Sequence, residues 1–151
     1  MQRIILISCV SKKGGKKAKA KELYKGPLFL SSLSFAYKLK PDKIFILSAL
    51  HHLLDLEKEI EPYNVTLSKI QNKKNKSQCK VLTNEEKIKW GEIAIKQLQL
   101  VSNIKNDEFI FLAGAEYIKP FEKIISNNNI KKPLKGLRLG ERIKFMSNFK
   151  T

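Results

Sequence analysis

Three short runs of consecutive apolar residues mark the chain. They cover Arg3–Ser8 (RIILIS), Lys43–Ser48 (KIFILS) and residues 108–113 (EFIFLA). Apolar residues that follow one another, rather than alternating with polar ones, are typical of strands buried on both faces. We therefore predict three buried strands.

Longer segments with helical spacing separate these runs. In residues 28–39 the apolar positions fit one buried helical face, which Pro41 ends. Thr83 and Glu86 form the Thr-x-x-Glu pattern of a capping box, so a long amphipathic helix, Asn84–Val101, is predicted to begin there. Shorter helices are predicted over residues 18–24, 116–126 and 140–149.

The alternation of apolar strands with helices predicts the fold class. Strands separated by helices favour a parallel sheet that is covered on both faces. At 151 residues the chain fits one domain with a core of its own. We expect a single α/β domain, residues 1–151, with a mostly parallel central sheet and helices on both faces.

Such a sheet also predicts where a ligand binds. In open α/β sheets, ligands bind outside the carboxyl ends of the strands. Small or polar residues follow the three predicted strands, and those of parallel neighbours meet at one edge. The candidates for substrate binding at this edge are Ser8, Cys9, Lys13, Ser48, Gly114 and Tyr117.

Titratable residues concentrate after the second strand. His51 and His52 are the only two histidines, and four of the 14 acidic residues fall within residues 55–61. Tyr63 follows Pro62, where a turn can bring the acidic segment back over the strand ends. Titratable groups gathered at the end of a buried strand indicate a site.

The charge adds a candidate partner. Thirty Lys and Arg against 14 Asp and Glu give a net charge of +16, and such a field attracts polyanions. The lysines fall in three clusters, and the predicted nucleic-acid contacts are Lys12, Lys16, Lys17, Lys73, Lys74, Lys76, Lys131 and Lys132. An alternative stays open, because richness in Lys and Asn also follows from an AT-rich genome, and the lysines would then serve solubility alone.

Composition excludes several classes of protein. No apolar run approaches the roughly 20 residues of a membrane span, and the N-terminus does not resemble a signal peptide. Cys9 and Cys79 are too few for a disulfide framework or a zinc site, and the adjacent histidines point in different directions. We expect a cytoplasmic protein without membrane partner, metal or cofactor.

Five segments together carry a resemblance to a known family. They read ILISCVSKK, KAKELYKGPLF, ILSALHHLLDLEKEIEPYNVTL, FLAGAEY and PLKGLRLGER, and they run nearly end to end. The chain resembles a small domain family of unknown function that is distantly related to the YaaA proteins. One position departs from the pattern, because members of that family usually carry glycine where this chain has His52.

The resemblance implies a cytosolic role linked to nucleic acid. YaaA-type proteins are associated with DNA binding and oxidative stress, and related domains with excision or exchange of modified bases. DNA is therefore a more favoured partner than RNA.

The candidate residues can be compared with the groups that hydrolysis of an N-glycosidic bond requires. It requires a carboxylate that stabilises the sugar cation or activates water, a donor for the leaving base and an aromatic ring that stacks on the base. Asp55 or Glu61 is the candidate carboxylate and His51 the candidate donor. The aromatic candidates are Tyr24, Tyr63 and Tyr117.

Each residue also has a structural interpretation. Asp55 can cap the turn that follows Leu54, and Tyr63 can simply pack its loop. Two functions therefore stay open. One is an enzyme that acts on a nucleobase or N-glycosidic bond at a strand-end pocket, and the other is a non-catalytic basic protein that binds DNA or RNA.

Overall fold

The fold is organised around strand β1 (Arg3–Ser8), which lies in the middle of the main sheet. The computed structural model describes residues 1–10, 13–67 and 80–149. Within β1, residues 4–7 are at most 1% exposed. A strand can be this apolar only where both faces of its sheet are covered.

The main sheet has five strands in the order β4-β3-β1-β8-β9. Strands β3 (Lys43–Ser48) and β8 (Glu108–Leu112) both pair with β1 in parallel, which confirms the predicted arrangement. The sequence did not predict the two edge strands. Strand β9 (Ile130–Lys131) pairs in parallel with β8, whereas β4 (His52–Asp55) is antiparallel to β3.

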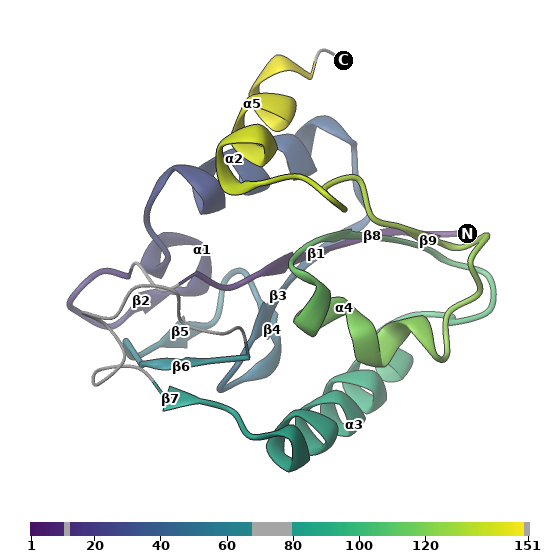
Figure 1. Ribbon diagram of the computed structural model, residues 1–151, viewed down its shortest axis with the longest axis horizontal. Helices are drawn as coiled ribbons and strands as arrows, with labels where there is room; N and C mark the ends of the chain where they lie inside the picture. The colour runs from purple at the N-terminus through teal and green to yellow at the C-terminus, as the bar shows by residue number, and fades with distance from the viewer. Residues whose placement is uncertain (11–12, 68–79, 150–151) are drawn as a thin grey trace.

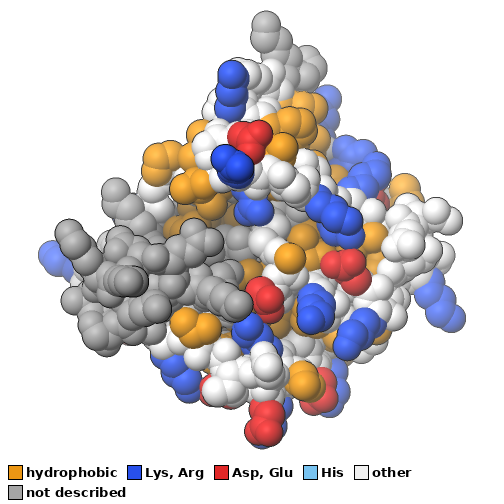
Figure 2. All heavy atoms as spheres, in the orientation of Figure 1, with side chains coloured by type: hydrophobic (Ala, Val, Ile, Leu, Met, Phe, Trp, Pro, Cys, Tyr) orange, Lys and Arg blue, Asp and Glu red, His pale blue; other side chains and the backbone are white. Residues whose placement is uncertain are grey.

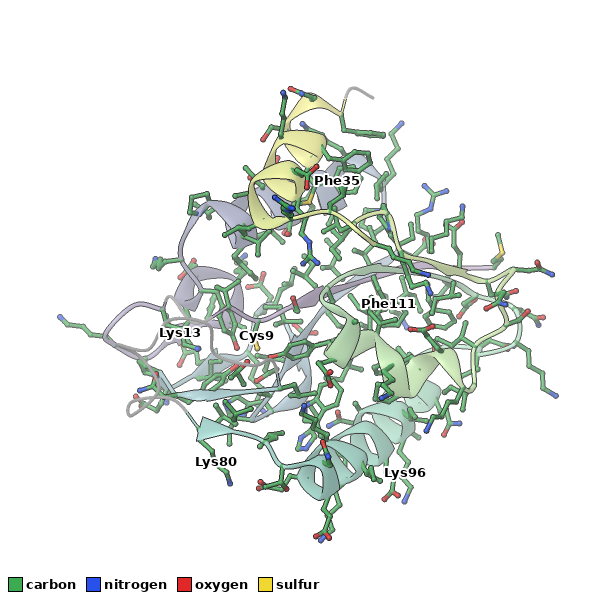
Figure 3. All side chains as sticks on the ribbon, viewed as in Figure 1. Cys9, Lys13, Phe35, Lys80, Lys96 and Phe111 are labelled. Atoms are coloured by element: carbon green, nitrogen blue, oxygen red, sulfur yellow. The ribbon has the colours of Figure 1, made fainter. Side chains whose placement is uncertain are left out.

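Helices cover both faces of this sheet (Figure 1). Helices α1 (Ala20–Leu23), α2 (Pro27–Lys38) and α5 (Leu139–Asn148) lie on one face. Helices α3 (Asn84–Val101) and α4 (Ala115–Glu122) lie on the other. Side chains alternate between the two faces along a strand, so Ile5 and Ile7 of β1 pack in the α2 layer and its Ile4 and Leu6 in the α4 layer. Figure 3 labels one residue of each layer, Phe35 on the α2 side and Phe111 on the α4 side. The prediction of an α/β fold with a mostly parallel sheet is confirmed.

Two short ribbons stand beside the carboxyl end of the sheet. Strand β2 (Ala18–Lys19) pairs antiparallel with β5 (Glu59–Ile60), and β6 (Val65–Thr66) pairs in parallel with β7 (Lys80–Val81). The helix predicted over residues 18–24 therefore begins only at Ala20. The first two residues of that segment use their backbone groups in the ribbon instead.

The helix boundaries follow local signals. Thr83 and Glu86 form the predicted capping box at the start of α3, with Glu86 N donating to Thr83 Oγ1 over 3.2 Å. Helix α4 ends at Glu122, four residues before the predicted end. Within the described ranges, none of the helices combines the length and apolar character that crossing a membrane requires.

Helices α3 and α4 approach each other closely at Gly91. A Cβ atom added to this glycine would lie 2.7 Å from Cβ of Pro120, which is closer than two carbon atoms can pack. Gly91 is buried, and its missing side chain lets the two helices of this layer touch. Where packing is this tight, an added methyl group forces the backbone of one helix to move.

We predict that Gly91→Ala lowers the free energy of unfolding by about 1–3 kcal/mol, because the added methyl group overpacks the α3–α4 contact. The matched control is Gly140→Ala in α5, where nothing lies within 4 Å of the added Cβ. Urea unfolding followed by circular dichroism measures both. Equal stability of the two variants would contradict the close contact.

Candidate functional site

The carboxyl edge of the sheet brings three chain segments together. Cys9 follows β1, and its backbone N–H donates to Leu47 O of β3 over 3.0 Å. Its half-buried side chain contacts both core layers, so it lies where the two faces of the sheet meet. Figure 3 labels Cys9 and Lys13 at this end of the molecule. Ser8, Ser48 and Gly114 end or follow the three parallel strands as predicted.

Three hydroxyl groups form a chain on the α2 side of this edge. Tyr63 Oη lies 2.7 Å from Ser48 Oγ and 2.5 Å from Tyr24 Oη. Three hydroxyl groups carry three protons, and the two links use only two of them. One hydroxyl proton of the chain is therefore used by neither link.

Lys13 lies above the tyrosines of this chain. Its Nζ is 4.3 Å from the centre of the Tyr63 ring and 5.6 Å from that of Tyr24, both within cation–π range. The residue is also held by its backbone, because it forms a β-bridge with Tyr24. The ammonium group of the first loop is thus fixed beside two aromatic faces.

A second group of polar atoms surrounds Tyr117 on the α4 side. Its hydroxyl oxygen lies 3.4 Å from Cys9 Sγ, 3.4 Å from Thr66 Oγ1 and 3.4 Å from the backbone N of Leu67. The sequence did not predict a role for Thr66. The only signal was its place near the end of the segment ILSALHHLLDLEKEIEPYNVTL, which carries the family resemblance but assigns it no contact.

Burial keeps the three phenols protonated. It raises the pKa of Tyr24, Tyr63 and Tyr117 well above the ordinary value, and the neighbouring Cys9 raises each pKa further. Phenols with such pKa values are neutral near pH 7. They can donate and accept hydrogen bonds at this edge, but they cannot act there as anions.

The two histidines lie at the turn between β3 and β4. Ser48 pairs with His52 across a three-residue loop, and His52 has a positive φ of 65°. A left-handed residue commonly ends such a loop, and histidine adopts this conformation more often than most residues. His52 therefore takes a backbone conformation that glycine adopts most easily.

The turn is fastened by Trp90 of α3. Its Nε1 donates to Ser48 O over 2.8 Å, and its ring stacks on His52 at 6.4 Å between centroids. The sequence singled out no function for Trp90. It is the only tryptophan of the chain and lies within the predicted helix Asn84–Val101, and these two facts point to no contact with the turn.

His51 turns its ring toward the hydroxyl chain. Its backbone N donates to Ser48 Oγ over 3.0 Å, and its ring meets Tyr63 edge to face at 5.5 Å. Its Nε2 is buried and, within the described residues, has no hydrogen-bond partner. Burial lowers the pKa of His51, and the positive charges of Lys58 and His52 lower it further.

The two candidate carboxylates lie at different distances from this site. Asp55 is exposed and pairs with Phe45 of β3. Phe45 lies three residues before the end of β3, so Asp55 is roughly 10 Å from the carboxyl edge of the sheet. Its Oδ1 accepts from the backbone N of Glu57 over 2.9 Å, so it caps the turn. Glu61 is also exposed, but only Pro62 separates it from Tyr63, so their Cα atoms lie within about 7 Å. Contacts therefore join two groups: His51, Ser48, Tyr63, Tyr24 and Lys13 on the α2 side, and Cys9 with Tyr117 on the α4 side. Asp55 belongs to neither group. Glu61 is near Tyr63 along the chain, and Ser8 and Gly114 are placed at the strand ends.

The predicted nucleic-acid contacts have different surroundings. Lys16 and Lys17 are exposed in the first loop, whereas Lys131 pairs with Glu108 at 2.6 Å and Lys132 with Glu122 at 3.2 Å. In the face that Figure 2 shows, basic side chains are spread over the surface with acidic ones among them. The remaining predicted contacts lie outside the described residues: Lys12, Lys73, Lys74 and Lys76.

No group of three or more metal-ligating side chains occurs in the part of the chain that the structure describes. The site is therefore a set of hydroxyl, thiol, imidazole and ammonium groups. These groups can hold a ligand by hydrogen bonds and by aromatic stacking.

Comparison with known proteins assigns the chain to a family. The model of a family of unknown function, DUF6884, matches residues 4–148, and the chain belongs to this family. A relationship to the YaaA proteins is not shown. No curated protein and no solved structure matches the chain.

We predict that the protein loses stability as the pH falls below 6.5, the ordinary pKa of histidine. Burial lowers the pKa of both His51 and His52 in the folded state, so the unfolded state binds more protons between the lowered and the ordinary value. Urea midpoints measured from pH 8 down to about pH 5, where most carboxyl groups stay ionised, report this loss. His51→Gln should flatten the dependence, and a wild-type midpoint that does not change over this range would contradict it.

Proposed function

We propose that this protein is a nucleic-acid-linked enzyme that acts on a nucleobase or an N-glycosidic bond at the carboxyl edge of its sheet. The observation that carries the proposal is the group formed by Tyr24, Tyr63 and Ser48 with Lys13 above it. It combines aromatic faces, neutral donors and a fixed cation at the edge where open α/β sheets bind ligands.

Each part of this group matches a requirement of base excision. A nucleobase can stack on the partly exposed ring of Tyr63 and receive a hydrogen bond from a neutral hydroxyl group, whereas Tyr24 is buried and holds Tyr63 in place. The high pKa of the buried phenols keeps their protons in place for such a bond. The ammonium of Lys13 can contact a phosphate or an anionic leaving base.

Glu61 is our candidate for the carboxylate that stabilises the sugar cation or activates water. It is exposed and adjoins Pro62 and Tyr63, whereas Asp55 already caps a turn away from the edge. His51, whose lowered pKa favours the neutral imidazole, is our candidate for the group that exchanges a proton with the leaving base.

The partner that we propose is a nucleic acid, with DNA favoured over RNA. The net charge of +16 and the exposed Lys16 and Lys17 beside the site support it. Membership in DUF6884 assigns no activity, and a distant relationship to the YaaA proteins stays a prediction, as does a cytoplasmic location. The second candidate, a non-catalytic binding protein, is favoured by the same charge.

We predict that Glu61→Gln lowers turnover by roughly a hundredfold or more while nucleic-acid affinity changes little. Removing a group that acts in the transition state changes rate more than ground-state binding. The measurement is base release, detected by mass spectrometry, from single- and double-stranded DNA and RNA that contain modified bases.

Asp55→Asn is the matched control, because it removes one exposed carboxylate from the same segment. It should keep turnover near the wild-type rate. If Glu61→Gln keeps full activity, the assignment of the carboxylate is wrong. If the wild type releases no base from any of these substrates, the binding-protein alternative is favoured.

We predict that nucleic acid binds with a steep salt dependence and that the double variant Lys16→Gln, Lys17→Gln reduces the slope. Each lost phosphate contact removes about 0.9 from the slope of log K against log salt on duplex DNA, so the change is up to about 2. Fluorescence anisotropy with a labelled duplex at several salt concentrations measures it.

The control is Lys89→Gln with Lys96→Gln, which removes the same charge from α3 (Figure 3 labels Lys96). An equal loss of slope in both double variants would mean that net charge alone attracts the polyanion. Binding that does not respond to salt would contradict the polyanion proposal itself.

A further inference from the structure

A groove lies away from the site described above, between the α2–α5 layer and the edge of the sheet that ends in β9. Its volume is about 480 Å³, within the range of small-molecule sites. It includes Arg3, the first residue of β1, whereas Cys9 follows the end of this strand. Six residues of extended chain, roughly 20 Å, separate the two places, so the groove is a second location on the molecule.

The walls of the groove are mainly apolar. Phe35 is buried at its base and is met edge to face by Phe145 at 5.9 Å and by Phe149 at 5.0 Å. Phe145 is nevertheless 42% exposed, which is unusual for a phenylalanine that packs against the core. An aromatic wall that stays open to solvent can be covered by a flat or chain-like apolar body.

Every charged residue that lines the groove is a cation. These residues are Arg3, Lys131 and Lys132. Glu108, with a side chain only 13% exposed, lies outside the lining and pairs with both Arg3 and Lys131 at 2.6 Å. Lys132 pairs with Glu122 at 3.2 Å, and Glu122 also lies outside the lining. The groove is therefore lined by cations, and their carboxylate partners lie outside it.

Arg3 is held in place and still has a donor to offer. Its Nε donates to Glu108 and its Nη1 to Leu39 O over 2.6 Å. Its Nη2 has no hydrogen-bond partner within residues 1–10, 13–67 and 80–149. A guanidinium group fixed by two of its nitrogens loses little entropy when the third binds an anion.

We infer that this groove binds a small amphipathic anion, with an aromatic or short acyl body against Phe145 and Phe149 and a carboxylate or phosphate at Arg3 and Lys131. The complementarity of charge and of apolar surface selects this class. A bare anion would leave the aromatic wall uncovered, and a neutral apolar molecule would offer no acceptor to Nη2 of Arg3. The inference is independent of the proposed activity, because none of these residues contacts the strand-end site.

The test uses the full chain and the fluorescent probe 8-anilinonaphthalene-1-sulfonate, which joins an aromatic body to one anionic group. We expect saturable binding of one probe per chain. Lys131→Gln and Phe145→Ala should each weaken it about fivefold or more, as expected for the loss of one charge-assisted contact or one apolar wall. Decanoate and phenyl phosphate, added separately, identify whether a carboxylate or a phosphate displaces the probe better.

Two matched variants control for net charge and for exposed apolar surface. Lys96→Gln removes one positive charge from α3, and Leu100→Ala removes a side chain that is 87% exposed on the same helix. Both should bind the probe like the wild type. Thermal unfolding of every variant shows whether a fold is lost, since partly folded chains bind this probe as well.

Three results would overturn the inference. The first is that no saturable binding occurs, and the second is that Lys131→Gln and Phe145→Ala bind as the control variants do. The third is displacement of the probe by inorganic phosphate as readily as by phenyl phosphate, which would mean that the cations alone hold the ligand. Loss of base-release activity in Glu61→Gln bears on none of these results.

Discussion

The structure depends on the burial of β1 between two strands and two helical layers. Residues 4–7 are almost inaccessible to water, and each such side chain stabilises the fold by about 1.5–3 kcal/mol relative to an exposed one. Because β3 and β8 both pair with β1 in parallel, their carboxyl ends lie at the same edge as Cys9. The position of Ser48 at this edge therefore follows from the central strand pairing.

The sequence predicted the elements whose signal is local. The three apolar runs and the capping box at Thr83 are readable from consecutive residues, and the structure contains them. Strands β4 and β9 were not predicted, because they are short and exist only through pairing with a neighbour. The segment at residues 18–19 was assigned to a helix for the same reason, since its partner β5 lies 40 residues away in the chain.

The candidate site was also predictable only where its signal is local. Its location followed from the rule that ligands bind at the ends of parallel strands, and its residue types followed from the composition of residues 48–63. Its contacts could not be predicted, because Tyr24 meets Tyr63 across 39 residues and Cys9 meets Tyr117 across 108. Such contacts depend on how α1, the β3–β4 turn and α4 pack on the sheet, which no local pattern encodes.

The positive φ of His52 limits how the turn beside the site can vary. At this position a side chain must tolerate left-handed backbone, and a β-branched residue such as valine or threonine would meet its own neighbouring carbonyl groups. A saturation library at this position should therefore be restricted by backbone geometry rather than by polarity: glycine, asparagine and aspartate are compatible, although none of them reproduces the ring that stacks on Trp90. Only a small group of residues can consequently replace His52 without changing the backbone of the turn that pairs this position with Ser48.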